Sequence, residues 1–355
     1  MSAHTKLLSP VKSPLVTLLV PCCNESRHIE GSLRTILQQQ EPPGGCEVVV
    51  ADGSSEDGTR DILSRLSQQS VRLRVIDNPL RIVSSGLNAA IQVARGDVLI
   101  RMDAHTEYAP DYVLNCVETL DRTGADNVGG PWVARGGGHV SRAIAAAFQS
   151  PFAVGGARGH DPEHEGHVDT VYLGCWRRET FERFGYFDEE LVRNQDDEHN
   201  LRIIRGGGKI WQSPKIKSWY RPRSSLSALF RQYLQYGYWK ARVVQKHKLP
   251  ASVRHLVPGG FVAALCALCV VGAIWQPAWW VLGALLLVYV CANLAASLHC
   301  AMKNELALFP VLPAVFAAYH FGYGIGFLRG VWDFLIRRKR PSATFTSLTR
   351  GEAHG

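Results

Sequence analysis

The sequence feature that most constrains this chain is a run of 48 residues, 255–302, without a single Asp, Glu, Lys or Arg. A membrane-spanning helix needs about 20 apolar residues, so this run is too long for one span and fits two joined tightly. The joint is expected at Gln276-Pro277. A further uncharged run is interrupted by Pro310, Pro313 and glycines. We therefore expect membrane segments near 256–275, 279–298 and 306–328.

Charge is divided unevenly along the chain. Residues 1–200 hold 19 Lys/Arg and 28 Asp/Glu, whereas residues 201–355 hold 20 and 3. Thirteen Lys/Arg and no acidic residue lie in 201–260, directly before the first apolar run, as expected on the cytoplasmic side of a bilayer. The basic half therefore indicates a membrane partner and no nucleic acid. Residues 1–13 lack the apolar region of a signal peptide, so the first 200 residues are expected in the cytoplasm.

The first half alternates β-rich runs with amphipathic helical stretches, which is the pattern of a parallel sheet with crossover helices. Ligands of such sheets bind at the carboxyl ends of the strands. Three of these ends carry polar clusters, at 21–25, 52–59 and 103–105. Residues 21–26 contain no glycine, so the fingerprint of a dinucleotide-binding domain is missing after the first strand.

Four motifs in this order resemble those of the family 2 glycosyltransferases, enzymes of GT-A fold that use nucleotide-activated sugars. They are Leu19–Glu25 (LVPCCNE), Val49–Thr59 (VVADGSSEDGT), Gly96–Asp103 (GDVLIRMD) and Gln195–Glu198 (QDDE), the last followed by Leu201 and Arg202. The resemblance runs from 15 to about 205, and the basic and apolar segments extend it to about 330. It is greatest to the membrane-bound enzymes of exopolysaccharide assembly, such as succinoglycan glucosyltransferases.

The resemblance implies an α/β GT-A domain, Rossmann-like, followed by C-terminal transmembrane helices. The expected organisation is an N-terminal tail at 1–14, the GT-A domain at 15–222, a basic amphipathic helix region in the bilayer interface at 223–254, membrane segments at 255–328 and a basic polar tail at 329–355. Three spans would place the basic residues 337–340 opposite the catalytic domain. Either the third run is re-entrant or interfacial, or the positive-inside rule is overridden.

The resemblance implies donor nucleotide binding by residues at the ends of the first, second and fourth strands, and Asn78 and Asn88 could also reach the nucleotide. The candidate residues are Pro21, Glu25, Asp52, Asn78, Asn88 and Asp103. A carboxylate such as Asp52 accepts hydrogen bonds from a uracil imide or a ribose hydroxyl. The alternative is local structure, because Asp and Asn are also good helix-capping and turn residues.

Asp103-Ala104-His105 stands where the family carries Asp-x-Asp, the motif that binds a divalent cation bridging the donor phosphates. Residues i and i+2 after a strand can face the same crevice, and a cation there neutralises charge on the leaving diphosphate. His105 departs from the family pattern. Because imidazole is a softer ligand than carboxylate, it shifts the preference from Mg²⁺ toward Mn²⁺. The alternative is a structural histidine at a strand end.

Inverting glycosyl transfer needs a base that takes the proton of the acceptor hydroxyl. Asp196 aligns with the family's base, and Asp197 is the alternative if the register slips; Gln195 stands where an acid is usual. Acidic residues also suit a helix N-terminus without any chemistry. Arg202 either faces substrate or pairs with Glu198 four residues before it.

Acceptor binding is assigned to Trp176, Arg202, Arg231 and Lys240. The ring of Trp176 either stacks on a sugar or packs in the core. Arg231 and Lys240 lie on the basic helix, where they either face the diphosphate of a polyprenyl-linked acceptor or simply anchor the helix to the membrane.

These observations predict an inverting, metal-dependent hexosyltransferase of the plasma (inner) membrane, with its catalytic domain in the cytoplasm. It moves a sugar, expected to be glucose, from a UDP-sugar to a polyprenyl-diphosphate-linked saccharide in exopolysaccharide or cell-surface glycan synthesis, using Mn²⁺ or Mg²⁺. The alternatives are a polyprenyl-phosphate sugar transferase, a processive synthase, or a membrane scaffold with a vestigial nucleotide site. A processive synthase usually has Gln-x-x-Arg-Trp after the base, which is missing here.

Overall fold

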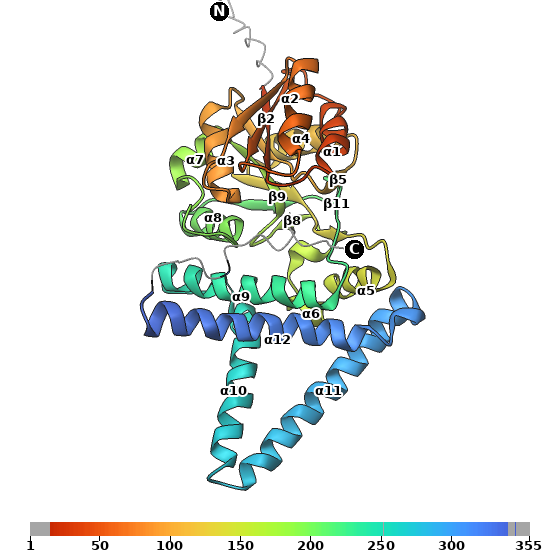
Figure 1. Cartoon of the computed structure of the whole chain (residues 1–355), viewed down its shortest axis with the longest axis vertical. Coiled ribbons are helices and arrows are strands. Elements are labelled where there is room, and N and C mark those ends of the chain that lie inside the picture. Colours follow the sequence, from red (N-terminus) through yellow and green to blue (C-terminus); the bar gives the residue numbers. More distant parts are fainter. Residues whose placement is uncertain (1–14, 251, 340–344, 346–355) are drawn as a thin grey trace, which may run out of the picture.

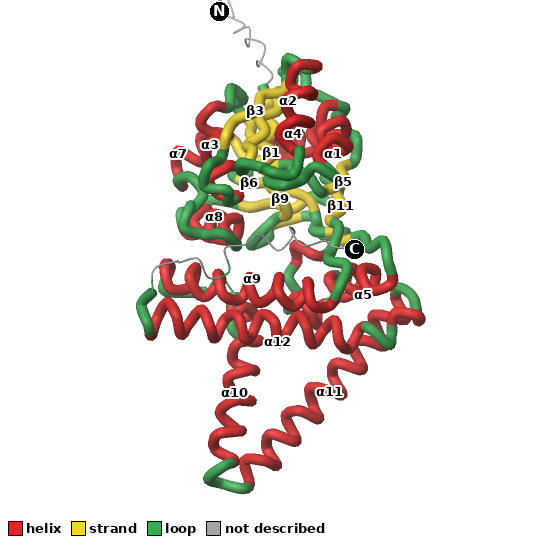
Figure 2. The backbone as a smooth tube through the Cα atoms, in the orientation of Figure 1, coloured by secondary structure: helices red, strands yellow, loops and turns green. Residues whose placement is uncertain are grey.

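The computed structural model describes residues 15–250, 252–339 and Phe345, so the predicted tail 1–14 and most of the tail 329–355 lie outside the described residues. An α/β domain occupies one end of the molecule, and a group of helices lies beneath it (Figure 1). Strands are confined to the α/β domain, whereas the lower part is helical (Figure 2).

An eight-stranded sheet forms the centre of the α/β domain, in the order β3-β2-β1-β4-β9-β6-β10-β8. The first four strands along this order are parallel, and β9 then runs antiparallel to both β4 and β6. The strands are β1 (Val16–Cys22), β2 (Cys46–Asp52), β3 (Leu73–Asp77), β4 (Val98–Arg101), β6 (Asn127–Gly130), β8 (Gly166–His167), β9 (Tyr172–Arg177) and β10 (Ile210–Gln212). A smaller sheet joins β5 (Thr106–Tyr108), β11 (Ser218–Tyr220) and β7 (Val133–Ala134).

Helices cover both faces of the large sheet, and alternate residues of each strand bury against opposite layers. Leu18 and Val20 of β1 pack in one core with Ile29 of α1 and Leu63 of α2, whereas Leu19 packs in the other. Both cores are closed by short helices: α1 (Ile29–Leu37), α2 (Thr59–Gln69) and α4 (Tyr112–Thr123) on one side, and α3 (Val83–Val93), α7 (Arg178–Phe184) and α8 (Gln195–Arg205) on the other. Burial on both faces explains the near-continuous apolar runs of β1 and β2.

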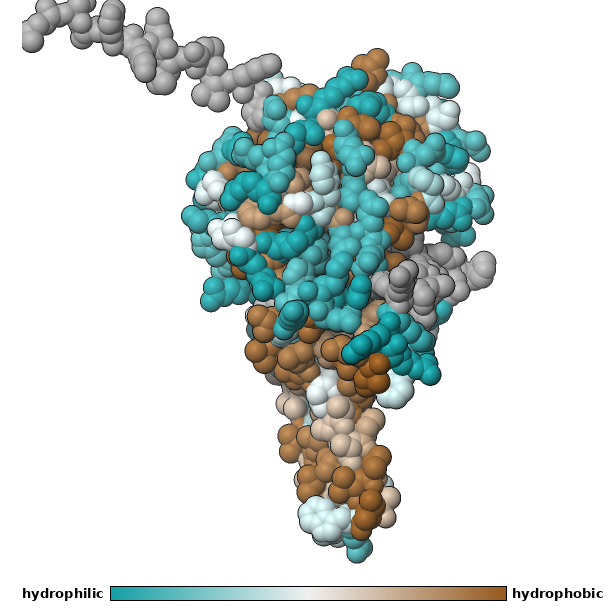
Figure 3. Space-filling model, turned by 90° about the vertical axis from the view of Figure 1, so that its left-hand side faces the viewer, coloured by the Kyte–Doolittle hydropathy of each residue, from teal (hydrophilic) through white to brown (hydrophobic). Residues whose placement is uncertain are grey.

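Helices α10 and α11 project away from the rest of the protein as a hairpin, and hydrophobic side chains dominate their visible surface (Figure 3). In the described part of the chain, two helices are long and apolar enough to cross a membrane, Val253–Gly272 and Pro277–Lys303. The remaining helices are α5 (His139–Phe148), α6 (Pro151–Val154), α9 (Leu226–His247), α10 (Val257–Gly272), α11 (Pro277–Lys303) and α12 (Leu312–Val331), with short turns η1 (Arg158–His160), η2 (Val253–His255), η3 (Leu306–Leu308) and η4 (Trp332–Ile336).

The third expected membrane segment, 306–328, is arranged differently from the first two. It forms η3 and α12, and α12 lies along α9 beneath the α/β domain, crossing the start of α10 instead of projecting with α10 and α11 (Figure 1). The physical reason is close backbone contact: a Cβ at Gly326 would collide with the carbonyl oxygen of Leu234, and one at Gly330 would lie 2.5 Å from that of Tyr238. The arrangement favours the interfacial alternative over a third span.

Candidate active site

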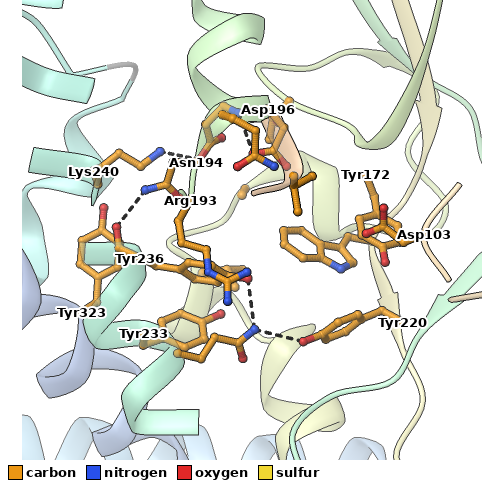
Figure 4. A pocket seen from close by; sticks show the side chains of 18 of the residues that line it. Asp103, Tyr172, Arg193, Asn194, Asp196, Tyr220, Tyr233, Tyr236, Lys240 and Tyr323 are labelled. Atoms are coloured by element: carbon orange, nitrogen blue, oxygen red, sulfur yellow. Dashed lines mark hydrogen bonds and ion pairs between the residues drawn. The ribbon is translucent and has the colours of Figure 1, made fainter. Parts of the chain in front are cut away.

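A cavity of about 770 Å³ lies between the α/β domain and the helices beneath it. Its walls come from the segments after β1 and β4, from the N-terminus of α8, and from α9, α10 and α12 (Figure 4). The predicted site residues that line it are Pro21, Glu25, Asp103, His105, Asp196, Asp197 and Lys240. The cavity thus brings together residues that are up to 219 positions apart in the sequence.

Asp103 lies two residues after the end of β4 and is buried. Its two carboxylate oxygens accept hydrogen bonds from Arg101, from Nε at 2.8 Å and from Nη2 at 3.1 Å. Burial alone would lower the pKa of the Arg101 guanidinium, but the carboxylates of Asp103 and Asp196 outweigh it and raise that pKa, so Arg101 stays charged. This buried cation compensates the charge of Asp103.

His105 connects the ends of β4 and β1. Its Nδ1 lies 3.4 Å from Oε1 of Glu25, and its Nε2 lies 4.0 Å from Oδ2 of Asp103. Within the described ranges, no group of three or more His, Cys, Asp or Glu side chains is arranged to hold a metal ion by itself. A carboxylate and an imidazole fit a cation that takes its other ligands from phosphate oxygens, and a carboxylate oxygen can accept from Arg101 and still ligate.

The first turn of α8 holds two adjacent carboxylates in different environments. Oδ1 of Asp196 accepts a hydrogen bond of 2.9 Å from the backbone N–H of Asp197. Burial, with the neighbouring charge of Asp197, raises the pKa of the Asp196 carboxyl. Burial also acts on Asp197, but Lys240, whose Nζ donates to Oδ2 at 2.5 Å, outweighs it and lowers the pKa of Asp197. Asp197 is therefore held ionised, whereas Asp196 binds a proton more readily.

Known proteins resemble this chain in sequence. A family model described as glycosyl transferase family 2 matches residues 17–182. Succinoglycan biosynthesis protein ExoA of Rhizobium meliloti (strain 1021) is 32% identical over 328 residues, which cover 90% of this chain and 96% of that protein. This chain belongs to glycosyltransferase family 2.

Two further proteins resemble this glycosyltransferase over most of its length. The dolichyl N-acetyl-alpha-D-glucosaminyl phosphate 3-beta-D-2,3-diacetamido-2,3-dideoxy-beta-D-glucuronosyltransferase of Methanococcus voltae is 26% identical over 326 residues, 89% of this chain and 97% of that protein. The mannosyltransferase PcManGT from Pyrobaculum calidifontis, solved in complex with GDP-Man and Mn²⁺, aligns with 91% of this chain and 89% of its own at 21% identity and a TM-score of 0.60. The predicted α/β GT-A fold and glycosyltransferase class are confirmed.

Three predicted donor residues of the glycosyltransferase lie outside the cavity lining, where their side chains support local structure. Asp52 is fully buried, and its carboxylate accepts from Oγ of Ser55 at 2.6 Å and lies 3.1 Å from Nε of Arg60. Asn78 accepts from Oγ of Ser85 at 2.6 Å, and Asn88 exchanges hydrogen bonds with the backbone of Phe187 at 2.9 and 3.0 Å. These contacts match the alternative in which the three side chains stabilise local turns and helix ends. A role of Asp52 in donor binding stays a prediction.

Three predicted acceptor residues also lie outside the cavity lining. Trp176 is 2% exposed and packs edge-on against Phe181 and Phe187, so its ring belongs to the core of the glycosyltransferase. Arg202 pairs with Glu198 through two contacts of 2.9 Å, which is the alternative predicted from their spacing. Arg231 is exposed on α9 outside the cavity lining. An acceptor role of these three residues therefore stays a prediction that the cavity lining does not support.

An aromatic wall of the glycosyltransferase cavity was not predicted from the sequence. Trp132 and Tyr172 stack with centroids 5.0 Å apart and ring planes 9° apart. Gln232 donates to the hydroxyls of Tyr220 at 3.2 Å and Tyr236 at 3.1 Å. The i, i+4 spacing of Gln232 and Tyr236 on one face of α9 was a usable signal. Tyr172 and Tyr220 lie on separate strands, so no spacing in the sequence indicates that they share a cavity wall.

Proposed function

We propose that this glycosyltransferase transfers a sugar from a nucleotide-diphosphate donor to a lipid-linked saccharide at the cytoplasmic face of a membrane. The observation that carries the proposal is the continuity of one cavity. It runs from Glu25, Asp103 and His105 past Asp196 to Val257 and Pro258 at the start of α10. A polar reaction centre therefore opens toward a helix that is apolar and long enough to cross a membrane.

The donor belongs at the end of the cavity lined by Pro21, Glu25, Asp103 and His105. We assign Asp103 and His105 as the protein ligands of a divalent cation; when bound, that cation neutralises charge on the departing diphosphate. The mannosyltransferase of like fold was solved with GDP-Man and Mn²⁺, which is compatible with this assignment. A UDP-sugar, with glucose as the sugar, remains our first expectation for this chain.

Asp196 is proposed as the general base. The acceptor hydroxyl oxygen attacks the anomeric carbon, its proton passes to the Asp196 carboxylate, and the bond between the anomeric carbon and the diphosphate oxygen breaks with inversion. The nucleoside diphosphate leaves with the bonding electron pair. Because Asp197 is engaged by Lys240 at 2.5 Å, Asp196 is the better candidate of the two adjacent acids.

The lipid-linked acceptor is supported by the position of the aromatic wall and by the relatives. Tyr233, Tyr236 and Tyr323 line the cavity on the side of α9 and α12, where sugar rings would pack on aromatic faces. The Rhizobium meliloti relative is named for succinoglycan biosynthesis, and the Methanococcus voltae relative for transfer to a dolichyl phosphate-linked sugar. Both names fit the predicted place of this enzyme in exopolysaccharide or cell-surface glycan synthesis at the plasma membrane.

The experiment that tests this function is transfer of labelled sugar from a panel of UDP- and GDP-sugars into lipid extract by membranes that contain the protein. It is run with Mn²⁺, with Mg²⁺ and with chelator. We expect metal-dependent labelling from one donor class, lost in Asp196→Asn and kept in the matched control Asp61→Asn, an exposed acid on α2. Nucleotide binding without any labelling of a native acceptor pool would instead support the scaffold alternative.

A further inference from the structure

The catalytic turn of α8 is bound to α9 through several side chains. Nδ2 of Asn194 donates to the carbonyl oxygen of Tyr236 at 2.9 Å, and Nζ of Lys240 donates to Asp197 at 2.5 Å. Two turns further along α9, Nε2 of His247 lies 2.9 Å from Oε1 of Glu198. Helix α9 therefore contacts residues that precede and follow Asp196, the proposed base.

Lys240 is a deeply buried charge in this contact. It is 3% exposed, and a buried ammonium persists only when it is paired. Its partner Asp197 also supplies the backbone N–H that donates to Oδ1 of Asp196 at 2.9 Å. Fixing the side chain of Asp197 therefore fixes the peptide group that orients the Asp196 carboxylate. Figure 4 shows Lys240 reaching from α9 toward this turn.

We propose that Lys240 is a positioning residue: by pairing with Asp197 it holds the first turn of α8 so that Asp196 faces the acceptor hydroxyl. The inference rests on the proposed function and changes the predicted role of Lys240 from acceptor ligand to support of the base. Helix α9 then has two roles: it packs along α12, and it supplies the residue on which the geometry of the base depends.

The kinetic test compares Lys240→Met, Lys240→Arg and Asp197→Asn in the full-length protein. A misplaced base costs about 100-fold in rate, so we expect Lys240→Met to lower kcat by about that factor while the acceptor KM changes little. Lys240→Arg keeps the cation and restores most of the loss. The double variant Lys240→Met/Asp197→Asn is no slower than the slower single variant, because both substitutions remove the same pair.

The matched control is Lys246→Met, which removes another ion-paired lysine of α9. Lys246 is exposed and pairs with Asp188 and Glu190, away from the turn of Asp196. It should leave kcat unchanged. The inference is overturned if Lys240→Met raises the acceptor KM and spares kcat, or if the losses in Lys240→Met and Asp197→Asn multiply. Either result would make Lys240 an acceptor ligand.

A second measurement needs no substrate. Amide hydrogen exchange of residues 195–200 should become faster in both Lys240→Met and Asp197→Asn, remain slow in Lys240→Arg and Lys246→Met, and stay unchanged in β1 and β2. Unchanged exchange at 195–200 in Asp197→Asn, which breaks the pair without leaving a buried carboxylate unpaired, overturns the inference. A wild-type protein that transfers no sugar overturns the proposed function instead, so the two failures are distinguishable.

Discussion

Nδ1 of His105 lies 3.4 Å from Oε1 of Glu25, which joins the ends of β4 and β1 at one point of the cavity. The first prediction follows from this contact. His105→Ala should move the midpoint of the metal titration of transfer to higher concentration, because the imidazole is one of two proposed protein ligands. His105→Asp should restore activity with a preference for Mg²⁺ over Mn²⁺, since carboxylate is the harder ligand. Equal metal requirements in all three proteins would remove His105 from the metal site.

The second prediction concerns pH. Burial and Asp197 raise the pKa of Asp196, and the base acts in its ionised form. Transfer should therefore fall as pH drops through a value above the ordinary aspartate pKa of about 3.9. Asp196→Asn should be about 10²–10⁴-fold slower and lack this acidic limb. The check is kcat across pH for both proteins, with Asp61→Asn as control; an unchanged acidic limb in Asp196→Asn would contradict the assignment.

The third prediction tests the packing of α12 along α9. Gly326→Ala places a methyl group against the carbonyl oxygen of Leu234, and overpacking of this kind costs about 1–3 kcal/mol. We expect a lower thermal unfolding midpoint in detergent. Gly283→Ala is the matched control, because a Cβ there meets no atom within 4 Å. Equal midpoints for Gly326→Ala and the wild type would mean that the two helices are not packed this closely.

The fourth prediction concerns the membrane hairpin. If only α10 and α11 span and the α/β domain is cytoplasmic, as proposed, Gln276 at their joint faces the outside while Asn304 at the end of α11 returns to the cytoplasm. In a background without the exposed native cysteines, an impermeant maleimide should label Gln276→Cys in intact cells, and Asn304→Cys only after lysis. Labelling of Asn304→Cys in intact cells would contradict a two-span arrangement.

Much of the α/β domain was predictable because its signals are local. The apolar runs of β1 and β2 required burial on both faces, and the rule that ligands bind at carboxyl ends of parallel strands placed Glu25 and Asp103 in one crevice. The position of Gln276-Pro277 was likewise predicted, since α11 begins at Pro277.

The features that could not be predicted depend on contacts between residues far apart in the sequence, and such contacts leave no local sequence pattern. Residue type alone does not tell whether Trp176 stacks on a sugar or fills the core. In the sequence alone, the glycines of α12 look like interruptions of a membrane span. In the structure they allow α12 to pack closely against α9. Lys240 and Asp197 are 43 positions apart, so their pairing appears only once both helices are placed. For this reason the sequence assigned Lys240 to the acceptor.

The measurement that tests the central claim most directly compares two acceptors, the lipid-linked saccharide and the same saccharide released from its lipid. With the active donor and metal, the account predicts that the lipid-linked form is used and the free form is used poorly, because the cavity leads from Asp196 to the start of α10. Asp196→Asn should abolish transfer to either one. Equal use of the free saccharide, or undiminished transfer by Asp196→Asn, would contradict the account.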